Sequence, residues 1–184
     1  MKHLFFLSLA ALFALPSLAA QQAAVLPATA EVSLTFTRQS GAASNQYAVW
    51  VENAQGQYVR TLYATRWTAA GGWQRRPTSI PVWVSRSGLS EKTRAQVDAI
   101  SGATGQTGER VHVWDGRDSS GNPVPPGNYV IFVEGTLRWE NQVMHRAPIT
   151  IGQGPATATV SVEFSGPSTA ERGMLSGVSV RVLR

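Results

Sequence analysis

The segment from Asp98 to Gly108 holds the residues whose types and spacing suggest chemistry. It reads DAISGATGQTG and places three hydroxyl groups, on Ser101, Thr104 and Thr107, among glycine and alanine. A hydroxyl is the group that forms a phosphoester, and small neighbours leave it open to a second enzyme. The structural alternative is a helix stop followed by a loop that leads into a strand.

Two other groups of side chains carry potential metal ligands. Asp115, Asp118 and Asn122 offer the oxygen ligands that Ca²⁺ requires, but they lack the spacing of a calcium loop and a bidentate Glu. We therefore interpret them as turn residues that bond their own backbone. His112 and His145 can pair as metal ligands only if their strands are neighbours, and their spacing does not require it. The sequence thus predicts no metal site.

The composition removes several kinds of enzyme chemistry. The chain has no Cys, which excludes thiolate nucleophiles, Cys-ligated zinc, iron–sulfur clusters and thioether-linked haem. No nucleophile elbow and no obvious carboxylate pair is present. We expect no catalytic residues and no independent enzyme activity.

The N-terminal residues resemble a secretory signal peptide. Residues 1–19 combine Lys2, an apolar stretch ended by Pro16, and small residues before a cleavage site after Ala19. The apolar stretch is shorter than the roughly 20 residues needed to span a bilayer. We expect an exported chain with a flexible leader over residues 20–30. A disulfide-free exported protein fits a bacterial periplasm, with no membrane-spanning segment after cleavage.

Positive charge is concentrated between Arg60 and Arg94. This stretch has seven cations against Glu91 alone, whereas the rest of the chain after residue 19 has eight cations against ten acids. Tryptophans are interleaved with the arginines, and the candidate partner-binding residues are Arg66, Trp67, Trp73, Arg75 and Arg76. Arginine with aromatics suits an anionic aromatic ligand or an acidic surface. Export argues against nucleic acid, and the alternative is a solvated basic face with core tryptophans.

Hydrophobic periodicity predicts a β-rich chain. Eight segments show two-residue alternation or are rich in β-branched and aromatic residues: Glu31–Arg38, Gln46–Asn53, Tyr58–Tyr63, Arg110–Trp114, Asn128–Glu134, Gln142–Ile151, Ala156–Phe164 and Val178–Leu183. Residues 66–83 show no sustained period and are expected to form an ordered loop or an irregular edge. Leu89–Ile100 is the one expected helix, capped by Ser90.

The turn residues between Trp114 and Asn128 predict a β-hairpin. Asp-Gly, Gly-Asn and Pro-Pro-Gly sequences separate the two strand-like runs on either side of this connection. The number of strands and the Gly/Pro turns favour one all-β domain over residues 31–184. We expect an immunoglobulin-like antiparallel β-sandwich with one short helix.

Several motifs resemble known families. Trp114 to Asp118, with Gly121, Val124-Pro125, Gly127 and Tyr129, resembles the hairpin of immunoglobulin-like domains such as that of the flagellar hook-capping protein. The wider pattern, from Val32 to Ile151, is similar to the predicted periplasmic family filed as domain of unknown function 2271. It consists of Ala48–Glu52, Tyr58–Leu62, Val82-Trp83, Asp98–Thr104 and the Trp114 segment. This resemblance implies an exported β-rich domain and no established activity.

Asp98–Thr104 also resembles the flavinylation motif of exported flavin carriers, Asp-x-x-Ser/Thr-Gly-Ala-Thr. Every specified position is matched, by Asp98, Ser101, Gly102, Ala103 and Thr104. The resemblance implies that a flavin transferase joins flavin mononucleotide (FMN) covalently to Thr104. It implies a carrier that exchanges electrons with a periplasmic or inner-membrane redox protein. The alternative function is a cofactor-free periplasmic binding or accessory domain.

Overall fold

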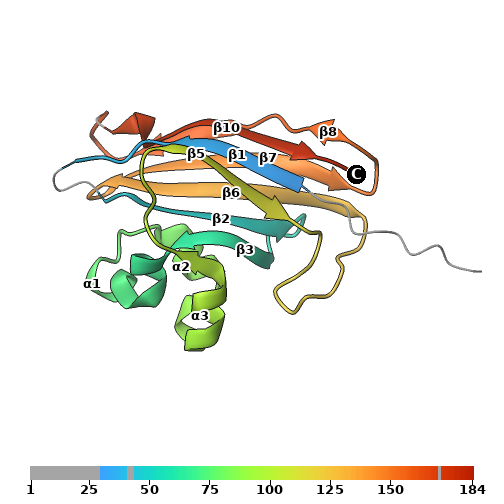
Figure 1. Cartoon of the computed structure of the whole chain (residues 1–184), viewed down its shortest axis with the longest axis horizontal. Helices are drawn as coiled ribbons and strands as arrows, with labels where there is room; N and C mark the ends of the chain where they lie inside the picture. Colours follow the sequence, from blue (N-terminus) through green and yellow to red (C-terminus); the bar gives the residue numbers. More distant parts are fainter. Residues whose placement is uncertain (1–29, 41–43, 170) are drawn as a thin grey trace, which may run out of the picture.

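The computed structural model describes residues 30–40, 44–169 and 171–184, and its strands account for most of the fold (Figure 1). The strands are β1 (Ala30–Phe36), β2 (Gln46–Asn53), β3 (Tyr58–Thr65), β4 (Ser101–Gly102), β5 (Gly108–Trp114), β6 (Gly127–Arg138), β7 (Asn141–Ile151), β8 (Ala156–Thr157), β9 (Ser161–Ser165) and β10 (Leu175–Val182). The expected signal peptide, residues 1–19, lies outside the described residues. So does the expected leader apart from Ala30, which is already part of β1.

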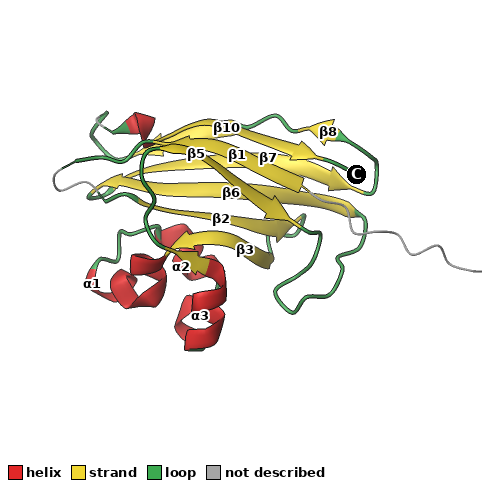
Figure 2. Ribbon diagram, viewed as in Figure 1, coloured by secondary structure: helices red, strands yellow, loops and turns green. Residues whose placement is uncertain are grey.

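Two sheets face each other in a sandwich. One has the order β5-β1-β10-β8 and the other the order β4-β3-β2-β6-β7-β9 (Figure 2). The strand pairs are antiparallel except for β3 and β4, which run parallel. The all-β class and the sandwich are therefore confirmed. Tyr129 donates a hydrogen bond from its hydroxyl to Pro125 O (2.8 Å), as the tyrosine corner of immunoglobulin domains does. The finer immunoglobulin-like assignment stays a prediction.

Apolar side chains from both sheets fill the space between them. On β1, Val32, Leu34 and Phe36 are at most 2% exposed, as their alternation predicted. Trp114 at the end of β5 is fully buried and packs edge to face against Tyr129 of β6, with ring centroids 5.2 Å apart. This inner core joins the two sheets.

A layer of short helices covers the outer face of the six-stranded sheet (Figures 1 and 2). It comprises η1 (Thr68–Gly72), α1 (Trp73–Arg75), α2 (Pro81–Arg86), η2 (Leu89–Glu91) and α3 (Arg94–Ile100), while η3 (Arg172–Met174) lies elsewhere, before β10. Apolar residues of this layer pack on Ala48 and Trp50 of β2, whereas Tyr47, Val49 and Val51 of the same strand face the inner core. This is why β2 is buried on both faces and reads as a nearly continuous apolar run.

Polar side chains of the sheet hold the helical layer in place. The Glu134 carboxylate accepts the backbone N–H of Val82 (3.1 Å) and of Trp83 (2.7 Å). Thr136 Oγ1 accepts the N–H of Ile80 (2.7 Å), and Trp83 donates its indole N–H to Thr61 Oγ1 (2.8 Å). Burial raises the pKa of Glu134 to about 7, although the two N–H groups pull it down.

The hairpin predicted between Arg110–Trp114 and Asn128–Glu134 is wrong. β5 pairs with β1 in one sheet, whereas β6 pairs with β2 and β7 in the other. The connection between them crosses from one sheet to the other. Turn residues specify that the chain reverses, but they do not specify which sheet the next strand joins.

Three local predictions also need correction. The expected helix over Leu89–Ile100 is divided, because Lys92 is extended and Thr93, not Ser90, caps α3. Residues 66–83, expected as a loop or irregular edge, contain η1, α1 and the start of α2. The expected strand Ala156–Phe164 splits into β8, paired with β10, and β9, paired with β7.

Candidate functional site

The loop that carries the predicted acceptor joins the two sheets at one side of the sandwich. It leaves β4, at the edge of the six-stranded sheet, and enters β5, at the edge of the four-stranded sheet (Figure 1). β4 is held by its parallel pairing with β3, in which Ser101 lies beside Ala64 and Gly102 beside Thr65. The loop is thus fixed to a sheet edge at both ends and remains on the surface.

Tyr63 of β3 orders the start of the loop. Its hydroxyl donates to Ala103 O (3.0 Å) and lies 3.4 Å from Gly102 O. A Cβ at position 102 would lie 2.8 Å from Cε2 of the Tyr63 ring, which is closer than side chains pack. The glycine of the motif therefore allows the backbone to lie directly against this ring.

Arg110 of β5 orders the end of the loop. Its guanidinium donates to Gln106 O and to Glu109 O, the latter at 2.6 Å, and Gly105 lies against it. A basic group thus lies directly next to the backbone that follows Thr104.

The three hydroxyl groups of the loop differ in what surrounds them. Ser101 Oγ is shut off from solvent and has no hydrogen-bond partner among the residues that the structure describes. Thr107 Oγ1 accepts the N–H of Arg38 (3.0 Å). Thr104 is partly exposed and, within the described part of the chain, its side chain forms no hydrogen bond. Of the three, Thr104 therefore offers the hydroxyl that is both reachable and unengaged.

Behind the loop lies an aromatic cluster of Tyr47, Tyr63 and His112. The ring centroid of Tyr63 lies 4.7 Å from that of Tyr47 and 4.9 Å from that of His112. Tyr47 Oη lies 3.3 Å from His112 Nε2. Burial, and then the charge of Arg110, lower the pKa of His112 to about 4, so its ring is neutral at neutral pH.

Sequence reasoning missed this cluster as part of the site. The alternation of β5 placed Arg110 and His112 on one face, and that is the face turned toward the core, since Val111 and Val113 are more than half exposed.

The remaining motif position, Asp98, connects the loop with the basic stretch. Its carboxylate pairs with Arg66 (2.8 Å) at the end of β3. This ion pair lies at the rim of a hollow of about 490 Å³ between η1 and α3, which Trp73 also lines. Two of the predicted partner-binding residues, Arg66 and Trp73, therefore lie at a pocket next to the motif.

The other predicted partner-binding residues form a separate outer surface. Arg75 stacks on Trp67, which is 41% exposed, with 5.8 Å from Cζ to the ring centroid. Arg76 stacks on Trp139 (5.3 Å), which is 55% exposed in the turn between β6 and β7. Trp139 was missed because it is far from the basic stretch in sequence.

The loop after β5 contrasts with the loop before it. Asp118 Oδ1 accepts the N–H groups of Ser120 (2.8 Å) and Asn122 (2.9 Å), and these bonds lower its pKa. Asp115 accepts the N–H of Arg117 (3.1 Å). The interpretation of these residues as self-bonded turn residues is confirmed.

The two histidines considered as metal ligands lie in different sheets. His112 is on β5 and His145 on β7, so their strands are not neighbours. In the described ranges, no cluster of three or more His, Asp or Glu side chains is placed to hold a metal ion.

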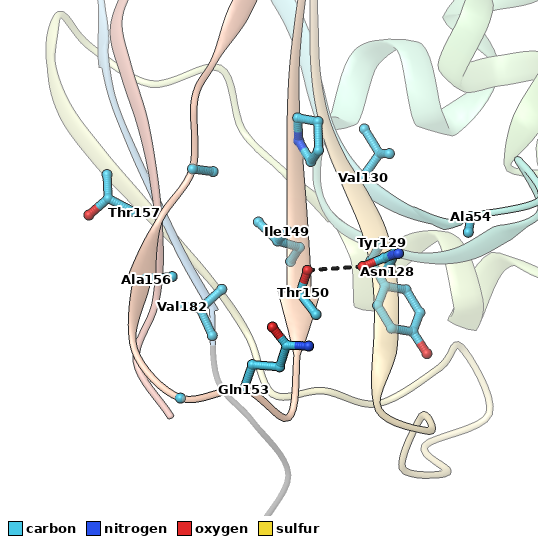
Figure 3. Close-up of a pocket in the computed structure, with 13 residues that line it drawn as sticks. Ala54, Asn128, Tyr129, Val130, Ile149, Thr150, Gln153, Ala156, Thr157 and Val182 are labelled. Atoms are coloured by element: carbon cyan, nitrogen blue, oxygen red, sulfur yellow. Dashed lines mark hydrogen bonds between the residues drawn. The ribbon is translucent and has the colours of Figure 1, made fainter.

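A second hollow, of about 500 Å³, lies elsewhere on the sandwich, between β6, β7, β8 and β10 (Figure 3). Ile149, Tyr129 and Val182 line it, together with Asn128 and Thr150, which share a hydrogen bond of 2.9 Å. Among the described residues that line it, none is charged and none belongs to Asp98–Thr104.

Fold and site together define a two-sheet β-sandwich with a helical layer on one face and a hydroxyl-bearing loop at one side. Residues 28–167 match the family model described as "Predicted periplasmic protein (DUF2271)". The chain belongs to this family, as its sequence motifs indicated, and the protein is periplasmic. No curated protein and no solved structure matches the chain. None of the helices in the described residues is long and apolar enough to cross a membrane.

Proposed function

We propose that this protein is a periplasmic flavin carrier with FMN attached covalently to Thr104. The observation that supports this most directly is the difference between the three hydroxyls of the loop. Ser101 Oγ is buried and Thr107 Oγ1 is engaged by Arg38, whereas the Thr104 hydroxyl is reachable and free of hydrogen bonds among the described residues.

The attachment is a phosphoryl transfer catalysed by a separate flavin transferase. The Thr104 hydroxyl oxygen bonds to the flavin-side phosphorus of a flavin dinucleotide, the pyrophosphate bond breaks, and the nucleoside monophosphate leaves. The hydroxyl proton passes to a base of the transferase. The resulting phosphodiester is anionic, and the Arg110 guanidinium next to Gly105 supplies a neighbouring positive charge.

The bound flavin would supply two-electron redox chemistry. A reduced periplasmic or inner-membrane redox protein is the electron donor, and a second, oxidised one is the acceptor. This chain's residues hold the attachment loop at the sheet edge, through Tyr63 and Arg110, and leave it accessible to both partners. No residue of the chain acts as a catalyst in this scheme.

Coexpression with a flavin transferase tests the attachment. We expect an intact mass raised by one FMN in the wild type and in Thr107→Ala, and an unmodified mass in Thr104→Ala. Thr104→Ser retains a hydroxyl and should be modified. Thermal unfolding of each variant serves as the folding control, because Thr104→Ala should change the stability by no more than about 0.5 kcal/mol.

A wild-type chain that stays unmodified would exclude the carrier and favour the cofactor-free accessory domain. An adduct that survives Thr104→Ala but is lost in Thr107→Ala would move the attachment point.

The surface of Trp67, Arg75, Arg76 and Trp139 is the candidate contact for an acidic redox partner. Neither Arg75 nor Arg76 forms an ion pair with an acidic residue in the described ranges. Binding should therefore weaken as salt rises, because exposed charges are screened beyond about 10 Å at 0.1 M. Arg75→Ala/Arg76→Ala should reduce the affinity in a titration without lowering the thermal midpoint. If the variant binds the partner with unchanged affinity, this surface is only a solvated basic face.

A further inference from the structure

The hollow between η1 and α3 has the features of a site for a planar, anionic ligand. It has a volume of about 490 Å³, within the range of small-molecule pockets. Trp73 forms part of its wall, and buried Leu89 and Val97 line it. A half-buried indole beside aliphatic side chains offers a surface on which an aromatic ring can stack.

The charge of the hollow favours an anion. Arg66, Lys92 and Arg94 line it against a single carboxylate, Asp98, which is already paired with Arg66. In the described part of the chain, Lys92 and Arg94 have no acidic partner. Arg94 is therefore an uncompensated cation beside the aromatic wall, and Lys92, whose ammonium also lies 5.3 Å from the Tyr58 ring centroid, adds a second positive charge at this hollow.

The hollow lies within reach of Thr104. β4 runs beside β3 so that Gly102 pairs with Thr65, the last residue of β3, and the residue that follows, Arg66, lines the hollow. Thr104 follows Gly102 by two residues, which span at most about 7 Å. A ring carried on the flexible ribityl chain of FMN can therefore reach the hollow from this attachment point.

A neighbouring hollow on the other side of α3 fits less well. It has a similar volume, about 500 Å³, and Tyr58 and Arg60 line it. Arg60 is already paired with Asp115 (3.2 Å), and its Nη1 lies 3.5 Å from Asp118 O.

We infer that the hollow lined by Trp73, Lys92 and Arg94 seats the isoalloxazine ring of a flavin attached at Thr104. The inference rests on the proposed carrier function and adds the place and the orientation of the ring. Trp73 stacks on the ring, and the two cations face its electron-rich polar edge. The helical layer thereby becomes the redox-tuning part of the molecule.

The test uses the coexpressed, flavinylated full chain. Trp73→Leu removes the stacking surface, and Trp67→Leu is the matched control, because Trp67 is an exposed tryptophan that does not line the hollow. Intact mass reports attachment, while flavin fluorescence and visible circular dichroism report the surroundings of the ring. We expect full attachment in both variants, with quenched fluorescence and an induced dichroic signal retained in Trp67→Leu and lost in Trp73→Leu.

Free FMN added to the unmodified chain gives a second measurement. Stacking on one aromatic side chain is worth a Kd change of roughly tenfold, so Trp73→Leu should weaken FMN binding by that factor. Lys92→Gln/Arg94→Gln should weaken FMN binding further and make it less dependent on salt concentration. Arg60→Gln, in the neighbouring hollow, should leave FMN binding unchanged.

The outcomes separate the two proposals. Full attachment with a flavin spectrum that is unchanged by Trp73→Leu, or that changes in Arg60→Gln instead, overturns the ring site and leaves the carrier. No attachment, with free FMN binding that still depends on Trp73, overturns the carrier and leaves a flavin-binding hollow. No attachment and no binding of free FMN overturns both.

Discussion

The two faces of the six-stranded sheet are held by different kinds of interaction. The inner face packs apolar side chains against the four-stranded sheet, with Trp114 and Ile131 fully buried. The outer face also has apolar contacts, but its helical layer is attached through the buried polar groups of Glu134, Thr136 and Thr61. The inner face therefore determines the global stability of the fold, whereas the outer face positions the layer that contains the hollow.

The largest expected effect is on the inner face. Trp114→Ala removes a fully buried side chain and its hydrogen bond to Arg117 O (2.8 Å), and should lower the free energy of unfolding by about 3–5 kcal/mol. Urea denaturation measures it, with the exposed Trp139→Ala as the matched control. Similar losses in both variants would contradict the assignment of stability to the inner face.

A pH-dependent effect is expected on the outer face. The pKa of Glu134 is raised from 4.5 to about 7, so the unfolded state loses its proton first as pH rises. As pH rises from about 4.5 to 7, the free energy of unfolding should therefore fall by on the order of 1–3 kcal/mol. Glu134→Gln stays neutral, and its urea midpoints at pH 5 and pH 8 should differ less than those of the wild type. An equal slope in both proteins would show that Glu134 ionises normally.

The most local expected effect concerns the attachment of α2. Thr136→Val leaves the N–H of Ile80 without its partner and removes one of two donors to Thr78 O, the other being Gln142, at a cost of about 1–3 kcal/mol. Because this bond belongs to the helical layer, hydrogen exchange should rise in residues 80–86 and stay unchanged in β1 and β10. Exchange that rises equally in both regions would show that the two faces unfold as one unit.

The same difference explains which parts of the fold could be predicted. Inner-face alternation, as in Val32, Leu34 and Phe36, is a local pattern that can be read directly from the chain. The capping box of α3 is also a local pattern, since Thr93 is followed three residues later by Gln96. The prediction of Ser90 as the cap overlooked this pattern. The irregular helical layer has no period to detect, because sheet residues such as Glu134, about 50 positions away, hold it.

The candidate site divides in a similar way. Its motif, Asp98 to Thr104, is contiguous and therefore visible in the sequence. The residues that shape the loop are not contiguous with it, because Tyr63 bonds a carbonyl 40 positions later and Arg110 contributes only through the inward face of β5. The pairing of Asp98 with Arg66 likewise depends on how α3 returns to β3.

Lys92 provides a side-chain amine that can be labelled selectively. It and Lys2 are the only lysines of the chain. Its ammonium lies 5.3 Å from the Tyr58 ring centroid, and its side chain borders both hollows beside α3. Apart from the N-terminal amine, an amine-reactive dye or photo-crosslinker would therefore label the described domain at one position, next to both hollows. A docked partner could then be captured and mapped by mass spectrometry without any engineered residue.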